Sequence, residues 1–153
     1  VSASLPSTFN VSRERTMSVS LSRVSAVLSD LSKWAPWDPW QNSETDIKLH
    51  VSKNANGLWS GRWLKDGGEH GRVIQQAHQS KNTIEYHLER SGEPLRRLRF
   101  ELQDLGMNTR VTWTVSGENK FYPIGNIFAV QMEKYVGPVY EKALNNLKKH
   151  LEK

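Results

Sequence analysis

The chain has 153 residues, of which 37% are hydrophobic and 24% are charged, with no cysteine and a formal net charge of +5. This composition indicates one globular domain, and it excludes a disordered chain, a disulfide scaffold and any site built on thiolates. The positive charge forms no concentrated patch along the sequence, so we expect no nucleic-acid partner.

The first eight residues are small and polar, and they predict a flexible tether (1–8) ahead of a single domain over residues 9–153. Because the chain starts at Val1 and not at Met, this tether follows either a removed segment or a cloning boundary. The absence of cysteine does not decide the compartment.

Apolar residues at even spacing predict a strand over roughly residues 9–19. Arg13 and Arg15 fall on the apolar face of that strand. Apolar residues at three- and four-residue steps over roughly residues 24–31 predict a helix that ends before Pro36. The following segment, 34–40, contains two prolines and three tryptophans, so it cannot be regular and its rings need burial.

From about residue 45 onward the pattern has a period of two, with turn residues between the alternating segments. Apolar and polar residues alternate in each segment, which is typical of an antiparallel meander with one wet face. The six expected strands centre on residues 47–51, 59–63, 71–79, 84–88, 98–102 and 111–115.

The last element is a long amphipathic helix, expected over about residues 125–152 and kinked at Gly137 and Pro138. The full order is strand, helix, short broken helical segment, six strands, long helix, or β-α-α-β6-α. These elements predict an α+β fold in which a curved seven-stranded antiparallel sheet wraps around the C-terminal helix. One helix rarely fills such a hollow, so aromatic side chains or a cavity must occupy the remainder.

This order and these residues resemble the START-like (SRPBCC) helix-grip superfamily, START/Bet v 1-like in fold and of the polyketide cyclase/dehydrase type. The resemblance covers about residues 9–152. It is carried by residues 11–13, 24–30 and 34–40, Trp63 with Gly71, the segment 109–119 (TRVTWTVSGEN) and the segment 136–148 (VGPVYEKALNNLK). The resemblance implies lipid carriers, ring-forming cyclases and receptors as relatives, and a hydrophobic membrane anchor ahead of residues 5–9. Without such an anchor we expect a cytoplasmic protein.

The predicted ligand-binding residues face the hollow between sheet and helix, although each is first of all a candidate core residue. They are Trp37, Trp63, Tyr86, Phe100, Trp113, Phe128, Met132 and Val136. We interpret the tryptophans of 34–40 as core residues under a loop rather than as a lid over a cavity mouth. If one of them is functional, we expect it to be Trp37. Arg15 either points to solvent at the sheet edge or anchors a ligand carboxylate from inside.

No catalytic constellation is identifiable, the five histidines do not cluster, and neither a metal nor a cofactor is expected. Our first hypothesis is therefore a binding module for a small hydrophobic ligand, lipid-like or polyketide-like. The alternatives are an interaction protein that uses the fold without a ligand, and a polyketide cyclase or dehydratase that acts mainly by folding its substrate.

Overall fold

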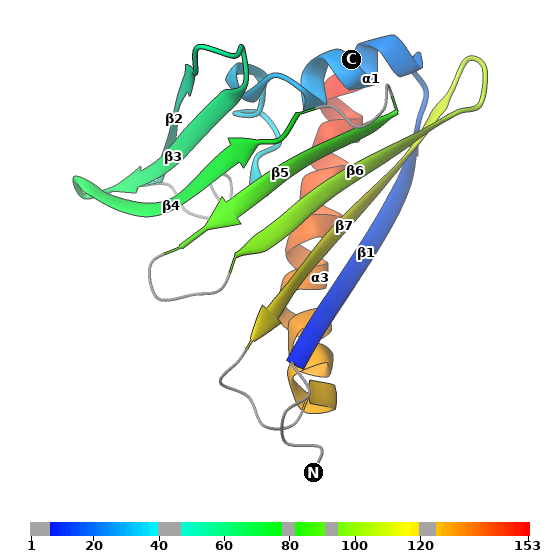
Figure 1. Cartoon of the computed structure of the whole chain (residues 1–153). Helices are drawn as coiled ribbons and strands as arrows, with labels where there is room; N and C mark the ends of the chain where they lie inside the picture. The colour runs from blue at the N-terminus through cyan, green and yellow to red at the C-terminus, as the bar shows by residue number, and fades with distance from the viewer. Residues whose placement is uncertain (1–6, 40–46, 78–81, 91–94, 120–124) are drawn as a thin grey trace.

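The computed structural model describes residues 7–39, 47–77, 82–90, 95–119 and 125–153, and the side chains of 9–39, 47–77, 82–90, 95–117, 134 and 136–153. The chain forms the predicted seven-stranded sheet and C-terminal helix (Figure 1). The elements are β1 (Ser7–Met17), α1 (Leu21–Leu28), the 3-10 helix η2 (Leu31–Lys33), β2 (Lys48–Lys53), β3 (Trp59–Lys65), β4 (Gly68–Gln75), β5 (Thr83–Glu89), β6 (Arg96–Asp104), β7 (Thr109–Asn119) and α3 (Gly125–Leu151).

The sheet is antiparallel throughout, in the order β1-β7-β6-β5-β4-β3-β2, so that β1 and β2 are its edges. Strand β1 begins at Ser7, two residues before the predicted strand, and Ser7 and Thr8 pair with Asn119 and Glu118. Residues 1–6 of the predicted tether lie outside the described residues. α3 runs along β1, with its C-terminal end beside α1 (Figure 1).

Alternation of side chains gives the sheet one buried and one wet face. In β6, Leu98, Phe100 and Leu102 are buried while the residues between them are exposed, and in β5 buried residues alternate with half-buried ones. The turn between β3 and β4 places Asp66 and Gly67 at φ values of 52° and 79°, as a tight hairpin turn of this kind requires.

The first helix is shorter than its apolar periodicity predicts. α1 ends at Leu28, and Leu31 belongs to the separate turn η2. The break has a local cause, because the Asp30 carboxylate accepts hydrogen bonds from the Ser32 amide (2.9 Å) and the Ser32 hydroxyl (2.5 Å). An aspartate in this role starts a new turn rather than continuing the old helix.

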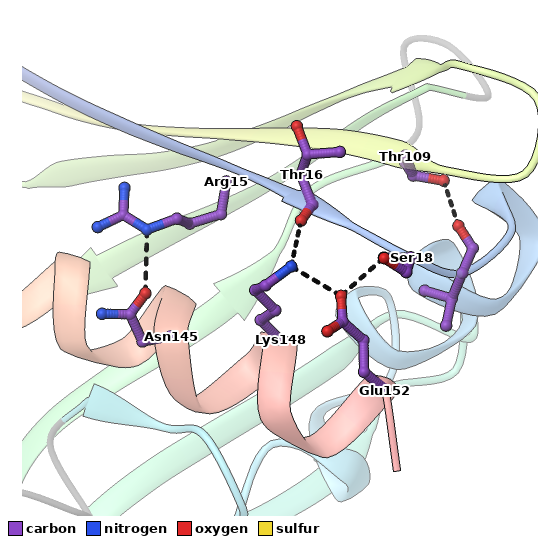
Figure 2. Close-up of polar contacts among 8 residues, drawn as sticks. Arg15, Thr16, Ser18, Thr109, Asn145, Lys148 and Glu152 are labelled. Atoms are coloured by element: carbon purple, nitrogen blue, oxygen red, sulfur yellow. Dashed lines mark hydrogen bonds and ion pairs between the residues drawn. The ribbon is translucent and has the colours of Figure 1, made fainter.

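Side chains cover backbone groups along the edge strand β1 and join it to α3 (Figure 2). Arg13 and Arg15 each donate from Nη1 to the preceding carbonyl oxygen, at 2.8 and 2.7 Å. Lys148 Nζ donates to the Thr16 carbonyl oxygen, and the Ser18 amide donates to a Glu152 carboxylate oxygen, both at 2.8 Å. A charged edge of this kind resists pairing with another chain.

α3 continues through Pro138 as one helix of 27 residues. In the part of the chain that the structure describes, no helix combines the length and apolar character that crossing a membrane requires.

Candidate ligand-binding site

The concave face of the sheet carries an aromatic row contributed by neighbouring strands. Phe100 of β6 lies opposite Trp113 of β7, and Tyr86 of β5 lies opposite Leu98 of β6. Strict alternation sends all four side chains to the same face, where each is fully buried. The strand period that predicted this face is thus sufficient to bring together three of the predicted site residues.

The segment after η2 folds under this row and adds two indole rings to it. The Trp34 and Trp37 ring centroids lie 4.6 Å apart. Trp34 packs edge-on against Tyr86 at 4.9 Å, and Trp37 packs edge-on against Phe100 at 6.1 Å and Trp113 at 5.8 Å. Both tryptophans are fully buried, as expected of core plugs.

Tyr140 of α3 closes the cluster from the helix side. Its ring lies 4.4 Å from that of Trp113, which in turn stacks on Phe100 at 4.8 Å. Burial raises the pKa of the Tyr140 hydroxyl, and the nearby positive charges of Arg96 and Arg90 oppose that shift. We call this set the ring cluster; its members are Trp34, Trp37, Tyr86, Phe100, Trp113 and Tyr140. The periodicity of the last helix predicted Tyr140 as a core residue but not as part of the site.

Tyr86 uses its hydroxyl inside the protein. The hydroxyl donates to the Leu28 carbonyl oxygen at 2.5 Å, and Gln75 Nε2 donates to the Ser29 carbonyl oxygen at 2.8 Å. Trp34 Nε1 also donates to the Leu28 carbonyl oxygen, at 3.3 Å. These bonds satisfy the carbonyl groups at the end of α1. Burial raises the pKa of the Tyr86 hydroxyl, and the charge of Asp30 adds to the shift.

Trp63 lies beside the ring cluster and binds a carboxylate that the sequence reasoning missed. Its Nε1 donates to Asp38 Oδ2 at 2.6 Å, and Asp38 is fully buried. The Trp63 ring and the stem of Arg90 both lie 3.4 Å from the position of a Cβ on Gly71, so that glycine leaves room for them. The only sequence signal was an acidic residue between a tryptophan and a proline, in a segment with many rings and no regular structure.

Two buried donors of the ring cluster have no acceptor in the part of the chain that the structure describes. Among the described residues, neither Trp37 Nε1 nor Trp113 Nε1 has a hydrogen-bond partner, although both are shut off from water. The Trp34 and Trp63 N–H groups, by contrast, are bonded. Unpartnered buried donors are uncommon in folded proteins because each costs free energy.

The helix side of the predicted site is described only in part. Val136 is half-buried and packs against the core. The predicted contacts Phe128 and Met132 have side chains outside the described residues. Among the described residues, the ring cluster and the adjoining Val136 therefore make up the predicted site.

Arg15 lies between β1 and α3 and is half-buried (Figure 2). Its Nε donates to Asn145 Oδ1 at 2.9 Å, so the guanidinium is held by the helix rather than pointing freely to solvent. Arg13 is placed in the same way, with its Nε 2.7 Å from Glu141 Oε1. The edge position that the sequence favoured for Arg15 agrees with the place of β1 in the sheet.

One pair of titratable groups lies on the outer face of the sheet. His87 Nε2 lies 3.2 Å from Glu85 Oε2 on the wet face of β5. Within the described ranges, no three histidine, aspartate or glutamate side chains come together in a way that would hold a metal ion.

Comparison with known proteins identifies a family that matches this chain. The family described as polyketide cyclase/dehydrase and lipid transport matches residues 8–152. No curated protein matches the sequence.

Solved structures share the fold at low identity. A START superfamily protein from Mycobacterium smegmatis is 18% identical, with a TM-score of 0.67 over 94% of this chain and 97% of that one. The ZhuI aromatase/cyclase from Streptomyces sp. R1128 is 14% identical, with a TM-score of 0.70 over 95% and 94%. Norcoclaurine synthase from Thalictrum flavum is 11% identical, with a TM-score of 0.65 over 96% of both chains.

Proposed function

The chain belongs to the polyketide cyclase/dehydrase and lipid transport family, and on this premise we propose that its domain binds a small hydrophobic ligand between the curved sheet and α3. The observation that carries the proposal is the ring cluster, in which side chains from β5, β6, β7, α3 and the segment after η2 meet on the concave face. Apolar walls with a few fixed polar groups are the usual form of such sites.

The driving force is burial of the ligand's apolar surface. A ligand that hides roughly 300 Å² gains about 7 kcal/mol before the costs of association are subtracted. Polar groups then set its orientation more than its affinity. Lipid-like and polyketide-like molecules both combine apolar surface with a few polar groups.

A cyclase-type reaction is the second candidate, and the buried carboxylate of Asp38 favours it. An acid inside an apolar hollow can serve as a general base once a substrate is folded against it. The Asp38 carboxylate is held at 2.6 Å by Trp63 Nε1, which would orient it. Conversion of a poly-carbonyl substrate by wild type but not by Asp38→Asn, with binding retained in both, supports this candidate.

The binding proposal is tested by filling the hollow from the helix side. Val136→Phe adds a ring at a half-buried position that packs against the core. Val139→Phe makes the same change three residues later at a position that is 36% exposed. Tryptophan quenching by a panel of fatty acids and polyphenols is measured for both variants and for wild type.

We expect saturable quenching in wild type and in Val139→Phe, and at least tenfold weaker binding in Val136→Phe. Mass spectrometry of small molecules that co-purify with the wild-type protein identifies the class of ligand. Flat titrations across the panel, with nothing co-purifying, would contradict the proposal and leave a partner-binding role of the fold.

A further inference from the structure

Four tryptophans of the described chain are fully buried, and they divide into two kinds. Trp34 and Trp63 are held by hydrogen bonds, to the Leu28 carbonyl oxygen and to Asp38. Trp37 and Trp113 are held by ring contacts alone, because no described residue accepts their N–H groups. The difference bears on which ring leaves its place most easily.

We propose that Trp37 is a displaceable plug of the binding site, and that the Trp113 indole N–H is the donor that orients a flat aromatic ligand through a carbonyl oxygen. This inference rests on the proposed binding function and adds the identity of the moving residue, the orienting donor and the class of ligand.

Trp37 is the ring that loses least by moving. Displacing Trp34 or Trp63 breaks a buried hydrogen bond, to the Leu28 carbonyl oxygen or to the Asp38 carboxylate. Displacing Trp37 breaks none, and its N–H gains a water acceptor outside. The preceding residues Ala35 and Pro36 are exposed, so the backbone that leads into Trp37 lies at the surface.

The backbone around Trp37 is fixed on both sides, which limits the movement to the side chain. The Asp38 amide donates to the Trp34 carbonyl oxygen at 2.7 Å, and the Asp38 carboxylate is bonded to Trp63. Trp34 itself is anchored to the end of α1. The movement that we propose is therefore a rotation about the Trp37 side-chain bonds.

Trp113 cannot move in this way. It lies in the middle of β7, paired with Arg13 of β1 on one side and Phe100 of β6 on the other. Its ring is also packed against Tyr140. Its N–H is thus a fixed donor that no described residue accepts, which favours a ligand that brings an acceptor.

The position of the Trp37 ring determines the shape of the ligand that can replace it. That ring contacts Trp34, Phe100 and Trp113, and an occupant must restore those contacts to offset their loss. A planar molecule of at least two fused rings does so. Because the Trp113 N–H that remains at the site is a donor, the ligand's polar atom must be an acceptor, and a ketone oxygen serves where a methylene does not.

The test uses two probes of nearly the same shape, 2-acetylnaphthalene and 2-ethylnaphthalene. The ratio of their dissociation constants is measured in wild type, Trp113→Phe and the control Trp59→Phe, whose ring is only half-buried. Comparing ratios between variants cancels the different hydration of the two probes. We expect the preference for the ketone to fall about tenfold in Trp113→Phe and to stay constant in Trp59→Phe.

A second readout does not depend on how well Trp113→Phe folds. In ¹⁵N-labelled wild type, the indole N–H signals of Trp37 and Trp113 should move on binding the ketone, that of Trp37 toward a water-exposed position. Those of Trp34 and Trp63 should stay in place.

Binding of both probes with an unchanged ratio in Trp113→Phe and a stationary Trp37 signal overturns the inference and leaves the proposed function standing. The same holds if neither probe binds while a fatty acid or polyphenol does. If the full ligand panel and both probes fail to bind, the inference and the proposed function fall together.

Discussion

Trp63 and Asp38 are 25 positions apart in the chain, and their side chains meet inside the protein with Nε1 and Oδ2 separated by 2.6 Å. The contact joins β3 to the segment that carries Trp34 and Trp37. It therefore positions the two tryptophans that this segment contributes to the ring cluster.

We expect Asp38→Leu to lower the free energy of unfolding by about 2–3 kcal/mol, because the buried hydrogen bond between Trp63 Nε1 and the Asp38 carboxylate is lost. Asp38→Asn keeps an acceptor oxygen and should cost about 1 kcal/mol. Urea unfolding measures both. Asp66→Asn is the control, at an exposed turn residue with positive φ that asparagine tolerates equally. Equal stabilities for Asp38→Leu and the control would contradict the role of this contact.

Tyr86 should make the protein sensitive to alkaline pH. Burial raises its pKa in the folded state above the ordinary value of 10.0, so the unfolded chain releases the proton first. The stabilisation is complete below about pH 10 and is lost above it, by about 1.4 kcal/mol per pH unit. The free energy of unfolding, measured with urea between pH 8 and 11, should fall less steeply with pH in Tyr86→Phe than in wild type. Tyr140 shifts in the same direction, so the double variant with Tyr140→Phe should be shallower still.

At pH 8 we expect Tyr86→Phe to lower the free energy of unfolding by about 1–2 kcal/mol, because the Leu28 carbonyl oxygen loses its closest donor. If the free energy of unfolding depends on pH in the same way in wild type and in both variants, the two tyrosines have the same pKa in the folded and unfolded states and the prediction is wrong.

Gly137 and Arg13 should be energetically coupled. A Cβ on Gly137 would overlap the Arg13 Nη2 atom, so Gly137→Ala must displace the guanidinium from its contact with Glu141. In the Arg13→Gln background the same change should stabilise the protein by about 0.5–1 kcal/mol through helix propensity. In wild type the lost ion pair should cancel that gain. A double-mutant cycle by urea unfolding measures the coupling, and simple additivity would show that the close approach has no energetic consequence.

The contact between β1 and the end of α3 should weaken in acid. Hydrogen bonds from Lys148 and from the Ser18 amide lower the pKa of Glu152 below its ordinary value of 4.5. The contribution of this carboxylate is therefore present above pH 4.5 and is lost as the pH falls through the folded-state value. The Ser18 amide proton shift, followed from pH 6 to 2, should titrate with a midpoint below 4.5 in wild type and stay flat in Glu152→Gln. A wild-type midpoint at or above 4.5 would contradict the contact.

Periodicity was sufficient for the fold and for part of the site. Alternation in β5, β6 and β7 predicted that Tyr86, Phe100 and Trp113 share one face, and their cross-strand positions agree. The three- and four-residue steps of the last segment predicted α3 and the burial of Tyr140. These features are local, because the pattern within one element decides which way its side chains point.

Other features depend on which elements meet. The sequence marked Arg15 as an exception on an apolar strand face, but only the packing of α3 along β1 gave it Asn145 as a partner. The apolar steps that placed Leu31 in the first helix did not reveal that Asp30 starts a new turn.

The sequence by itself determined the order of strands and helices, the direction in which their side chains point and the superfamily to which they belong. Tertiary structure alone decided that Asp38 is buried against Trp63, that Tyr86 bonds to the end of α1, and that two indole donors in the ring cluster lack acceptors among the described residues. The physical reason is that the direction of a side chain follows from its own backbone, whereas a hydrogen-bond partner comes from residues that are distant in the chain and are brought close only by packing.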